Sequence, residues 1–159
     1  MKIKFYPYLI TALLSSFTGH SQNAVQKIYP GNPSGSGFTS YSFIHDKGTA
    51  IDDQTIVIAD FKACVKSADT CRNESGSVTI YKRDLNSVWQ AKQVLTSPSK
   101  ESKHFGGSVS LYGNMLAITS EAEYRPDMVR SGAIYFYRRS NATADFELVT
   151  KVHGEDPFL

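Results

Sequence analysis

The chain has 159 residues and carries 17 lysines and arginines against 15 aspartates and glutamates. A balance this close to neutral gives no long-range attraction to phosphate groups or anionic lipid, and it argues against nucleic-acid binding. The length suits one ordinary domain with a sizeable core.

Residues 1–21 are predicted to be a signal peptide. Lys2 and Lys4 precede an apolar run at residues 8–17, and the small residues Gly19 and Ser21 follow. This order is typical of secretory signals, and the run is shorter than the about 20 apolar residues that a membrane-spanning helix needs. We therefore expect no membrane span and a secreted, periplasmic or cell-surface protein. A buried N-terminal strand or helix is the alternative.

Residues 22–43 are expected to be a linker with an extra strand. Within them, residues 24–30 (AVQKIYP) end as residues 91–98 (AKQVLTSP) do, with an aliphatic residue and a proline before a polar stretch. This likeness indicates a last strand that pairs with a unit elsewhere. A Gly/Ser-rich linker without fixed structure is the alternative.

The remaining sequence contains an internal repeat of two copies, with a period of about 60 residues. Residues 48–60 (GTAIDDQTIVIAD) align with residues 108–120, and residues 75–83 (SGSVTIYKR) align with residues 131–139 (SGAIYFYRR). Apolar residues alternate with period 2 in both copies, so each copy is predicted to form four short β-strands. An internal repeat of this kind indicates a stack of similar units.

In the second copy we expect strands at residues 108–111, 115–119, 133–138 and 146–152, with a tight turn at Gly113 and Asn114. In the fourth strand of each copy, alternate residues are expected on one face. These are Trp89, Ala91, Gln93 and Leu95 in the first copy and Phe146, Leu148, Thr150 and Val152 in the second.

The second copy resembles the FG-GAP repeat, the blade of the β-propellers in integrin α-subunit heads and many secreted bacterial proteins. The first copy is degenerate, because Asp46-Lys47 stands where Phe-Gly is expected. The resemblance implies an all-β fold of two four-stranded antiparallel blades, at residues 44–98 and 99–153, in an incomplete propeller. A simpler β-sandwich is the structural alternative. The matching residues are Phe105, Gly106, Ser108, Val109, Gly132, Ala133, Tyr135, Tyr137 and Arg138.

Phe105 and Gly106 are expected at the seam between the sheets, where the ring fills space and the glycine lets the backbone pass closely. Residues 154–159 stop short of a third Phe-Gly and are interpreted as the truncated start of a further linker or blade. Propellers close with about four to eight blades. We therefore expect further blades in a longer chain, or self-assembly.

Cys64 and Cys71 lie close together in one loop of the first copy. Because exported proteins keep disulfides, we expect a bridge between them that restricts the unfolded chain. A metal site is the alternative, although zinc needs four ligands and the nearest histidine in the sequence is His45.

No cofactor is expected. The turns at residues 52–54 and 112–114 are too short and too poor in carboxylates to wrap calcium. An irregular calcium site at Asp60, Asp69 and Glu74 is the alternative. The sequence contains neither HExxH nor a GxSxG that leads into a helix.

Two further groups of residues, the basic pairs that end the third strands and a set of loop carboxylates, are candidates for a functional site. Lys82-Arg83 and Arg138-Arg139 close the third strand of both copies, where they keep sheet edges charged or contact an anionic glycan or acidic partner. His45, His104 and His153 each lie in a linker next to a strand end and are expected to be surface or turn residues rather than ligands. The loop between the second and third strands of the second copy contains three carboxylates that could face a catalytic site, Glu121, Glu123 and Asp127.

Taken with the resemblance, these features predict an exported, non-enzymatic binding or scaffolding module that recognises a protein or a glycan. The alternative is a fragment of a secreted propeller enzyme, a hydrolase or lyase, whose active site is completed by blades outside this sequence.

Overall fold

The computed structural model describes residues 26, 28 and 48–155, apart from residues 64, 68–69, 73–74, 100–101, 103 and 128. The expected signal peptide, most of the linker, Asp46-Lys47 and residues 156–159 lie outside this part. The described residues form ten strands and no helix, and so they include no helix that could span a membrane. The predicted all-β class is confirmed.

The first sheet is antiparallel, with strands in the order β1-β2-β5-β6. Its strands are β1 (Thr49–Asp52), β2 (Thr55–Asp60), β5 (Ser77–Arg83) and β6 (Trp89–Thr96). Asp53 has a positive φ of 46° in the turn between β1 and β2, a conformation that Asp tolerates better than most residues. A separate hairpin of β3 (Val65–Ser67) and β4 (Thr70–Arg72) connects β2 to β5.

The second sheet repeats this order as β7-β8-β9-β10. Its strands are β7 (Phe105–Tyr112), β8 (Met115–Ser120), β9 (Ala133–Arg138) and β10 (Glu147–His153). The third strand has the predicted bounds. The first strand begins at Phe105, three residues earlier than predicted. The predicted turn at Gly113 and Asn114 is confirmed.

The two sheets share their register as well as their strand order. Ala59 pairs with Val78 in the first sheet, and Thr119 pairs with Ile134 in the second. The outer strands are irregular at the same place, since Lys92 and its equivalent Val149 are each skipped in the pairing. The repeat in the sequence is therefore a repeat of structure.

Because of these β-bulges, the prediction that alternate residues of each fourth strand lie on one face is wrong. Leu148 pairs with Tyr137 and Thr150 pairs with the adjacent Phe136. Because paired residues share a face and adjacent residues do not, the alternating set in β10 changes face at the bulge. The same holds for β6, where Ala91 pairs with Tyr81 and Gln93 with Ile80.

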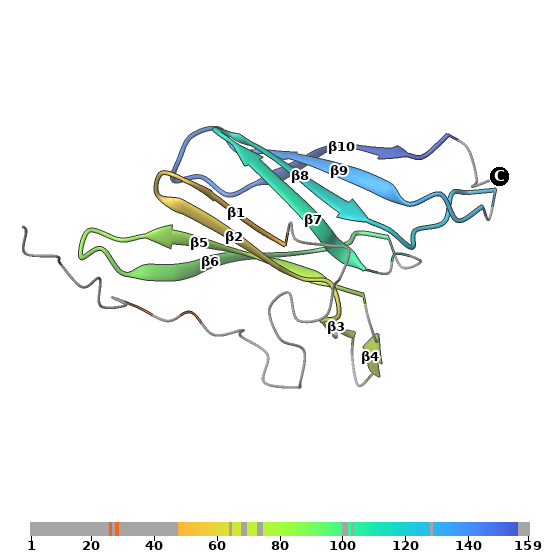
Figure 1. Cartoon of the computed structure of the whole chain (residues 1–159), viewed down its shortest axis with the longest axis horizontal. Coiled ribbons are helices and arrows are strands. Elements are labelled where there is room, and N and C mark those ends of the chain that lie inside the picture. Colours follow the sequence, from red (N-terminus) through yellow and green to blue (C-terminus); the bar gives the residue numbers. More distant parts are fainter. Residues whose placement is uncertain are drawn as a thin grey trace, which may run out of the picture.

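The sheets form two layers, and β7 lies beside β1 and β2 in the space between them (Figure 1). We call face A the side of the first sheet that carries Val57, Ala59, Val78, Ile80 and Leu95, together with the equivalent side of the second sheet. Face B is the opposite side, which in the second sheet carries Phe105, Val109, Leu116, Ile118, Tyr135 and Tyr137. Residues of both sets form one buried core.

Face A of the first sheet therefore packs on face B of the second. Because two different faces meet, the contact is head to tail, and face A of the second sheet is not used by it. Burial of this shared core is the main favourable contribution to folding.

Candidate functional site

Phe105 and Gly106 form the centre of the contact between the sheets, as the sequence predicted. Phe105 is fully buried, and its ring meets that of Tyr135 edge to face at 5.3 Å between centroids. Its backbone N–H donates to the carbonyl of Ser75 at 3.2 Å. Gly106 has a φ of +93°, and a Cβ there would lie 3.0 Å from the Cβ of Ala59. The glycine therefore allows the close approach of the two layers.

The other residues of the FG-GAP-like motif lie in the second sheet around this contact. Val109, Ala133, Tyr135 and Tyr137 are buried on face B, Ser108 is half-buried, and Arg138 is exposed. Gly132 has a φ of +67°, like Gly76 in the first sheet at +80°. The motif thus marks positions that build one face and the turn before β9.

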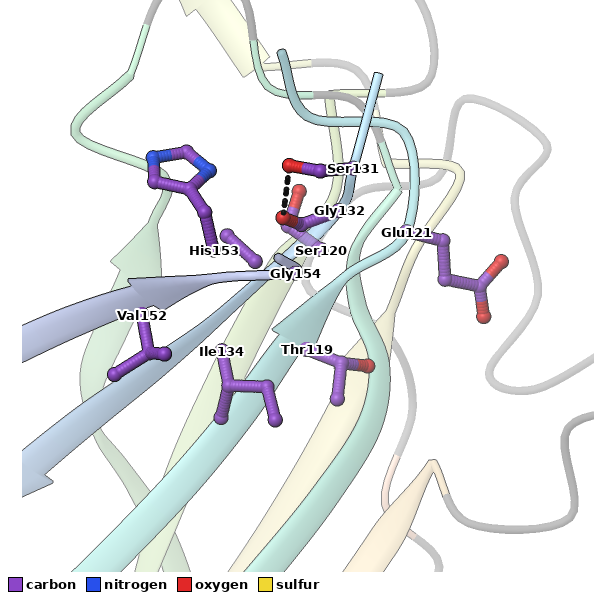
Figure 2. Close-up of a pocket in the computed structure, with 10 residues that line it drawn as sticks. Thr119, Ser120, Glu121, Ser131, Gly132, Ile134, Val152, His153 and Gly154 are labelled. Atoms are coloured by element: carbon purple, nitrogen blue, oxygen red, sulfur yellow. Dashed lines mark hydrogen bonds between the residues drawn. The ribbon is translucent and has the colours of Figure 1, made fainter. Parts of the chain in front are cut away.

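Face A of the second sheet is open, and this is the candidate site. Ile134 is 41% exposed although its equivalent Val78 is 0% exposed, and Val152 is 52% exposed where Leu95 is 9% exposed. Figure 2 shows the side chains of Thr119, Ile134 and Val152 pointing to the same side of the sheet. Exposed aliphatic residues that are buried in the equivalent unit indicate a surface suited to a partner.

A hollow of about 350 Å³ lies at one end of this face. It is lined by Thr119, Ser120, Glu121, Ser131, Gly132, Ala133, Ile134, Val152, His153 and Gly154. At its edge the Nδ1 atom of His153 is buried and has no hydrogen-bond partner among the described residues. Most of the lining surface is formed by apolar atoms, with a few polar groups beside them, as in many binding pockets.

In the loop after β8, Glu123 is the centre of a buried polar network. Its side chain is fully buried, and it accepts a hydrogen bond from the Tyr135 hydroxyl at 2.5 Å and forms an ion pair with Lys151 at 2.9 Å. The Tyr135 hydroxyl has one proton, which it donates to Glu123. In its contact with the Ser97 hydroxyl, at 2.9 Å, Tyr135 is therefore the acceptor and Ser97 the donor. Burial, followed by the bond to Glu123, raises the pKa of Tyr135. Both carboxylate oxygens of Glu123 are therefore engaged within the protein.

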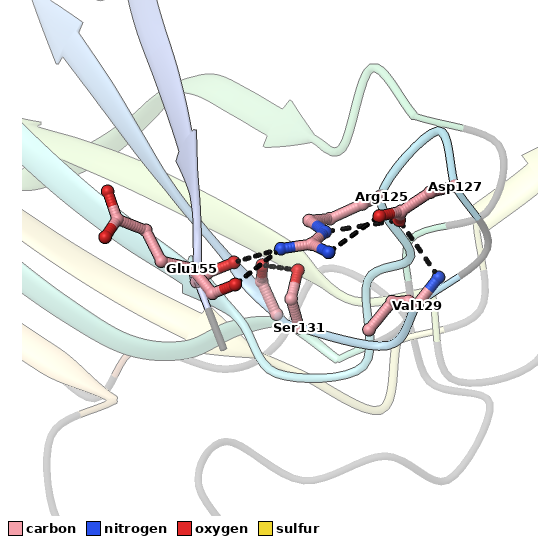
Figure 3. Close-up of polar contacts among 7 residues, drawn as sticks. Arg125, Asp127, Val129, Ser131 and Glu155 are labelled. Carbon is pink, nitrogen blue, oxygen red and sulfur yellow. Dashed lines mark hydrogen bonds and ion pairs between the residues drawn. The ribbon is translucent and has the colours of Figure 1, made fainter. Parts of the chain in front are cut away.

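Arg125 fixes the loop between β8 and β9 beside this network (Figure 3). Its guanidinium forms hydrogen bonds with both carboxylate oxygens of Asp127, at 3.2 and 2.6 Å, and donates to the carbonyls of Gly154 and Glu155. The Arg125 bond is the first cause that lowers the pKa of Asp127. The loop carboxylates Glu123 and Asp127 thus hold the loop and the end of β10 in place.

The basic pairs do not form one surface. Arg139 is only 5% exposed, and its guanidinium donates to the Thr55 hydroxyl at 2.7 Å and to the Asn114 side chain at 3.1 Å. Lys82 donates to the carbonyls of Thr143 and Ala144, each at 2.6 Å. These two residues connect the sheets, whereas Arg83 and Arg138 are exposed. Arg139 is therefore unsuited to the predicted contact with an anionic ligand, because burial and internal bonds occupy it.

The predicted disulfide and calcium residues fall largely outside the described part of the chain. Cys64, Asp69 and Glu74 are not described, and Cys71 lies in β4. Within the described part, no group of three or more histidine, cysteine, aspartate or glutamate side chains could hold a metal ion. The ring of His104 meets that of Phe61 at 5.6 Å between centroids, and His45 is not described.

Comparison with known proteins gives no relative: no family model, curated protein or solved structure matches this chain.

Proposed function

We propose that the protein is an exported, non-enzymatic binding or scaffolding module built from FG-GAP-like blades, and that face A of the second sheet contacts its partner. The observation that carries the proposal is the difference between Ile134 and Val78, which occupy equivalent positions but are open in one sheet and covered in the other. Because a stable exposed apolar surface of this kind usually marks a contact site, the second sheet is the unit that presents the partner surface.

The strand order supports the blade interpretation. Each sheet is a meander, interrupted in the first by the separate β3–β4 hairpin, and among the described residues no strand of one sheet is inserted into the other. A propeller is assembled from such four-stranded units, whereas many β-sandwiches exchange strands between sheets in Greek-key connections. The head-to-tail contact also agrees with a series of units.

The chemistry of the surface favours a protein partner over a glycan. Three aliphatic or thioether side chains, Met115, Ile134 and Val152, are exposed on face A. The enzyme alternative has less support, because Glu123 is engaged at both oxygens and Asp127 is bound by Arg125. Neither carboxylate is positioned to act on a substrate in this arrangement.

Photo-crosslinking from within the sheet tests the proposal. A photoreactive phenylalanine analogue placed at Ile134 is expected to capture a macromolecule in the exporting cells or their medium. The same analogue at Leu85, which is fully exposed in the turn after β5, is the matched control. Capture of the same molecules from both positions, or of none from Ile134, would contradict a contact surface on face A.

A further inference from the structure

The contacts that Phe105 and Gly106 make with the first sheet define a socket. Their partners are the carbonyl of Ser75, the backbone at Gly76, and the side chains of Ala59 and Val78. The socket depends on Gly76, whose φ is +80° and whose missing Cβ leaves room for the backbone of Phe105. The aromatic-glycine pair fits because it supplies a large ring and, next to it, a residue without a side chain.

The second sheet has the positions equivalent to this socket on its open face. The equivalent positions are Ser131, Gly132, Thr119 and Ile134, and these residues line the hollow. The pairing of Ala133 with Ser120 and with His153 repeats that of Ser77 with Asp60 and with Thr96. Gly132 also has a positive φ, of +67°. The strand pairing and the positive-φ glycine that receive Phe105 and Gly106 in the first sheet thus recur in the second, where the backbone of Gly154 lies beside the carbonyl of Ser131.

An independent contact shows that this kind of junction recurs. The side-chain amide of Gln93 forms two hydrogen bonds with the backbone of Phe146, both at 2.9 Å. Gln26 forms the same two bonds, at 2.8 and 3.0 Å, with the backbone of Trp89, the equivalent of Phe146. Gln26 therefore makes the same contact with the first sheet as Gln93 makes with the second. This glutamine–backbone contact of the junction occurs at both the first and the second sheet.

We propose that face A of the second sheet docks a further four-stranded unit whose first strand begins with an aromatic residue followed by glycine. This rests on the proposed function and names its partner. A second copy of the chain fits less well, because its Phe105 and Gly106 are already buried and the first repeat carries Asp46-Lys47 at the same place. A partner unit with its own aromatic-glycine pair fills the hollow and covers Ile134 and Val152.

An extended chain tests this directly. Residues 98–153 are repeated after Gly154, which takes the place of Ser97, so that the spacing before the added Phe-Gly is that of the natural repeat. Gly154 is kept because a Cβ there would lie 2.6 Å from the carbonyl oxygen of Ser131. The readout is oxidation of Met115 by hydrogen peroxide, located by mass spectrometry. Met115 is 42% exposed, whereas its equivalent Thr55 in the covered sheet is 1% exposed. The change Tyr112→Phe in the added copy gives its Met115-containing peptide a different mass, and that methionine serves as the exposed reference.

The proposal predicts that the original Met115 is oxidised about tenfold more slowly than the reference methionine. In the control, the added copy carries Phe105→Asp and Gly106→Lys, as in the degenerate first repeat, and the two rates become equal. Equal rates without these changes would overturn the proposal, and so would an added copy whose strand amides exchange as an unfolded chain. Protection of Met115 in the unextended chain at high concentration would also overturn it, because the occupant would then be a second copy.

The two tests fail separately. A macromolecule captured at Ile134 together with unprotected Met115 would reject the aromatic-glycine unit but keep the binding module. Protection of Met115 together with no capture at Ile134 would keep the socket and reject the partner surface in the exporting cells.

Discussion

The side chain of Gln93 holds the backbone of Phe146 at two points, since its amide oxygen accepts from the N–H and its amide nitrogen donates to the carbonyl. This contact joins the last strand of the first sheet to the start of the last strand of the second. It is a polar connection at the edge of an apolar seam, and it keeps the two units in a fixed relation.

Removing this amide is expected to destabilise the protein. Gln93→Ala leaves the N–H and carbonyl of Phe146 without their partner, and we expect the free energy of unfolding to fall by about 1–3 kcal/mol. Gln90→Ala, at an exposed position in the same strand, should change it by less than about 0.5 kcal/mol. Urea unfolding of the two variants measures the difference, and equal midpoints would show that the contact does not hold the sheets.

Glycine at position 76 is required for two reasons, which a matched pair of variants separates. Gly76→Ala introduces both the strain of a positive φ and a clash with the backbone of Phe105, whereas Gly113→Ala introduces the strain alone, because open space surrounds Gly113. We expect Gly113→Ala to cost about 1 kcal/mol and Gly76→Ala about 3 kcal/mol or more. Thermal unfolding of both variants is the measurement, and similar losses would mean that Phe105 does not dock at Gly76.

Arg139 and its neighbour Arg138 should behave differently although both are basic. Arg139 bonds to Thr55 across the seam and lies 5.0 Å from the centre of the Phe146 ring. We expect Arg139→Ala to lower the free energy of unfolding by about 3 kcal/mol and Arg138→Ala to change it by less than about 0.5 kcal/mol. Denaturant unfolding decides between them. An equally small effect at both positions would restore the idea of a solvated basic pair.

Alkaline pH is expected to weaken the fold through its buried tyrosines. Burial raises the pKa of Tyr137 from 10.0 to about 12. Above pH 10 the unfolded chain therefore loses this proton while the folded protein retains it, so stability is fully present below pH 10 and falls as the pH rises toward 12. Tyr137→Phe should flatten this fall, and Tyr112→Phe, at an exposed position, should not. Unfolding free energies across this range test it, and an unchanged slope in Tyr137→Phe would contradict the burial.

Much of this architecture could be predicted from the sequence because its strands alternate regularly and occur twice. The bounds of β9 and the position of Phe105 between the sheets followed from these patterns. The bulges at Lys92 and Val149 could not be predicted, because an extra residue in a strand leaves no signal in side-chain type.

The polar connections were also hidden in the sequence. Glu123 looked like a loop carboxylate, and only its pairing with Tyr135 and Lys151 in space shows that it is part of the core. Arg139 looked like the second half of an exposed basic pair, yet it follows the end of β9 and its side chain lies buried between the sheets, where it contacts Thr55. Contacts between distant residues decide such cases, and a single sequence does not record them.

Hydroxyl-radical footprinting of the intact protein tests the head-to-tail contact, because it compares equivalent side chains of the two sheets in one measurement. We expect strong labelling of Ile134 and Val152 and little labelling of their equivalents Val78 and Leu95, in line with their exposure. Equal labelling of the two pairs would contradict a head-to-tail contact that covers face A of the first sheet and leaves face A of the second open.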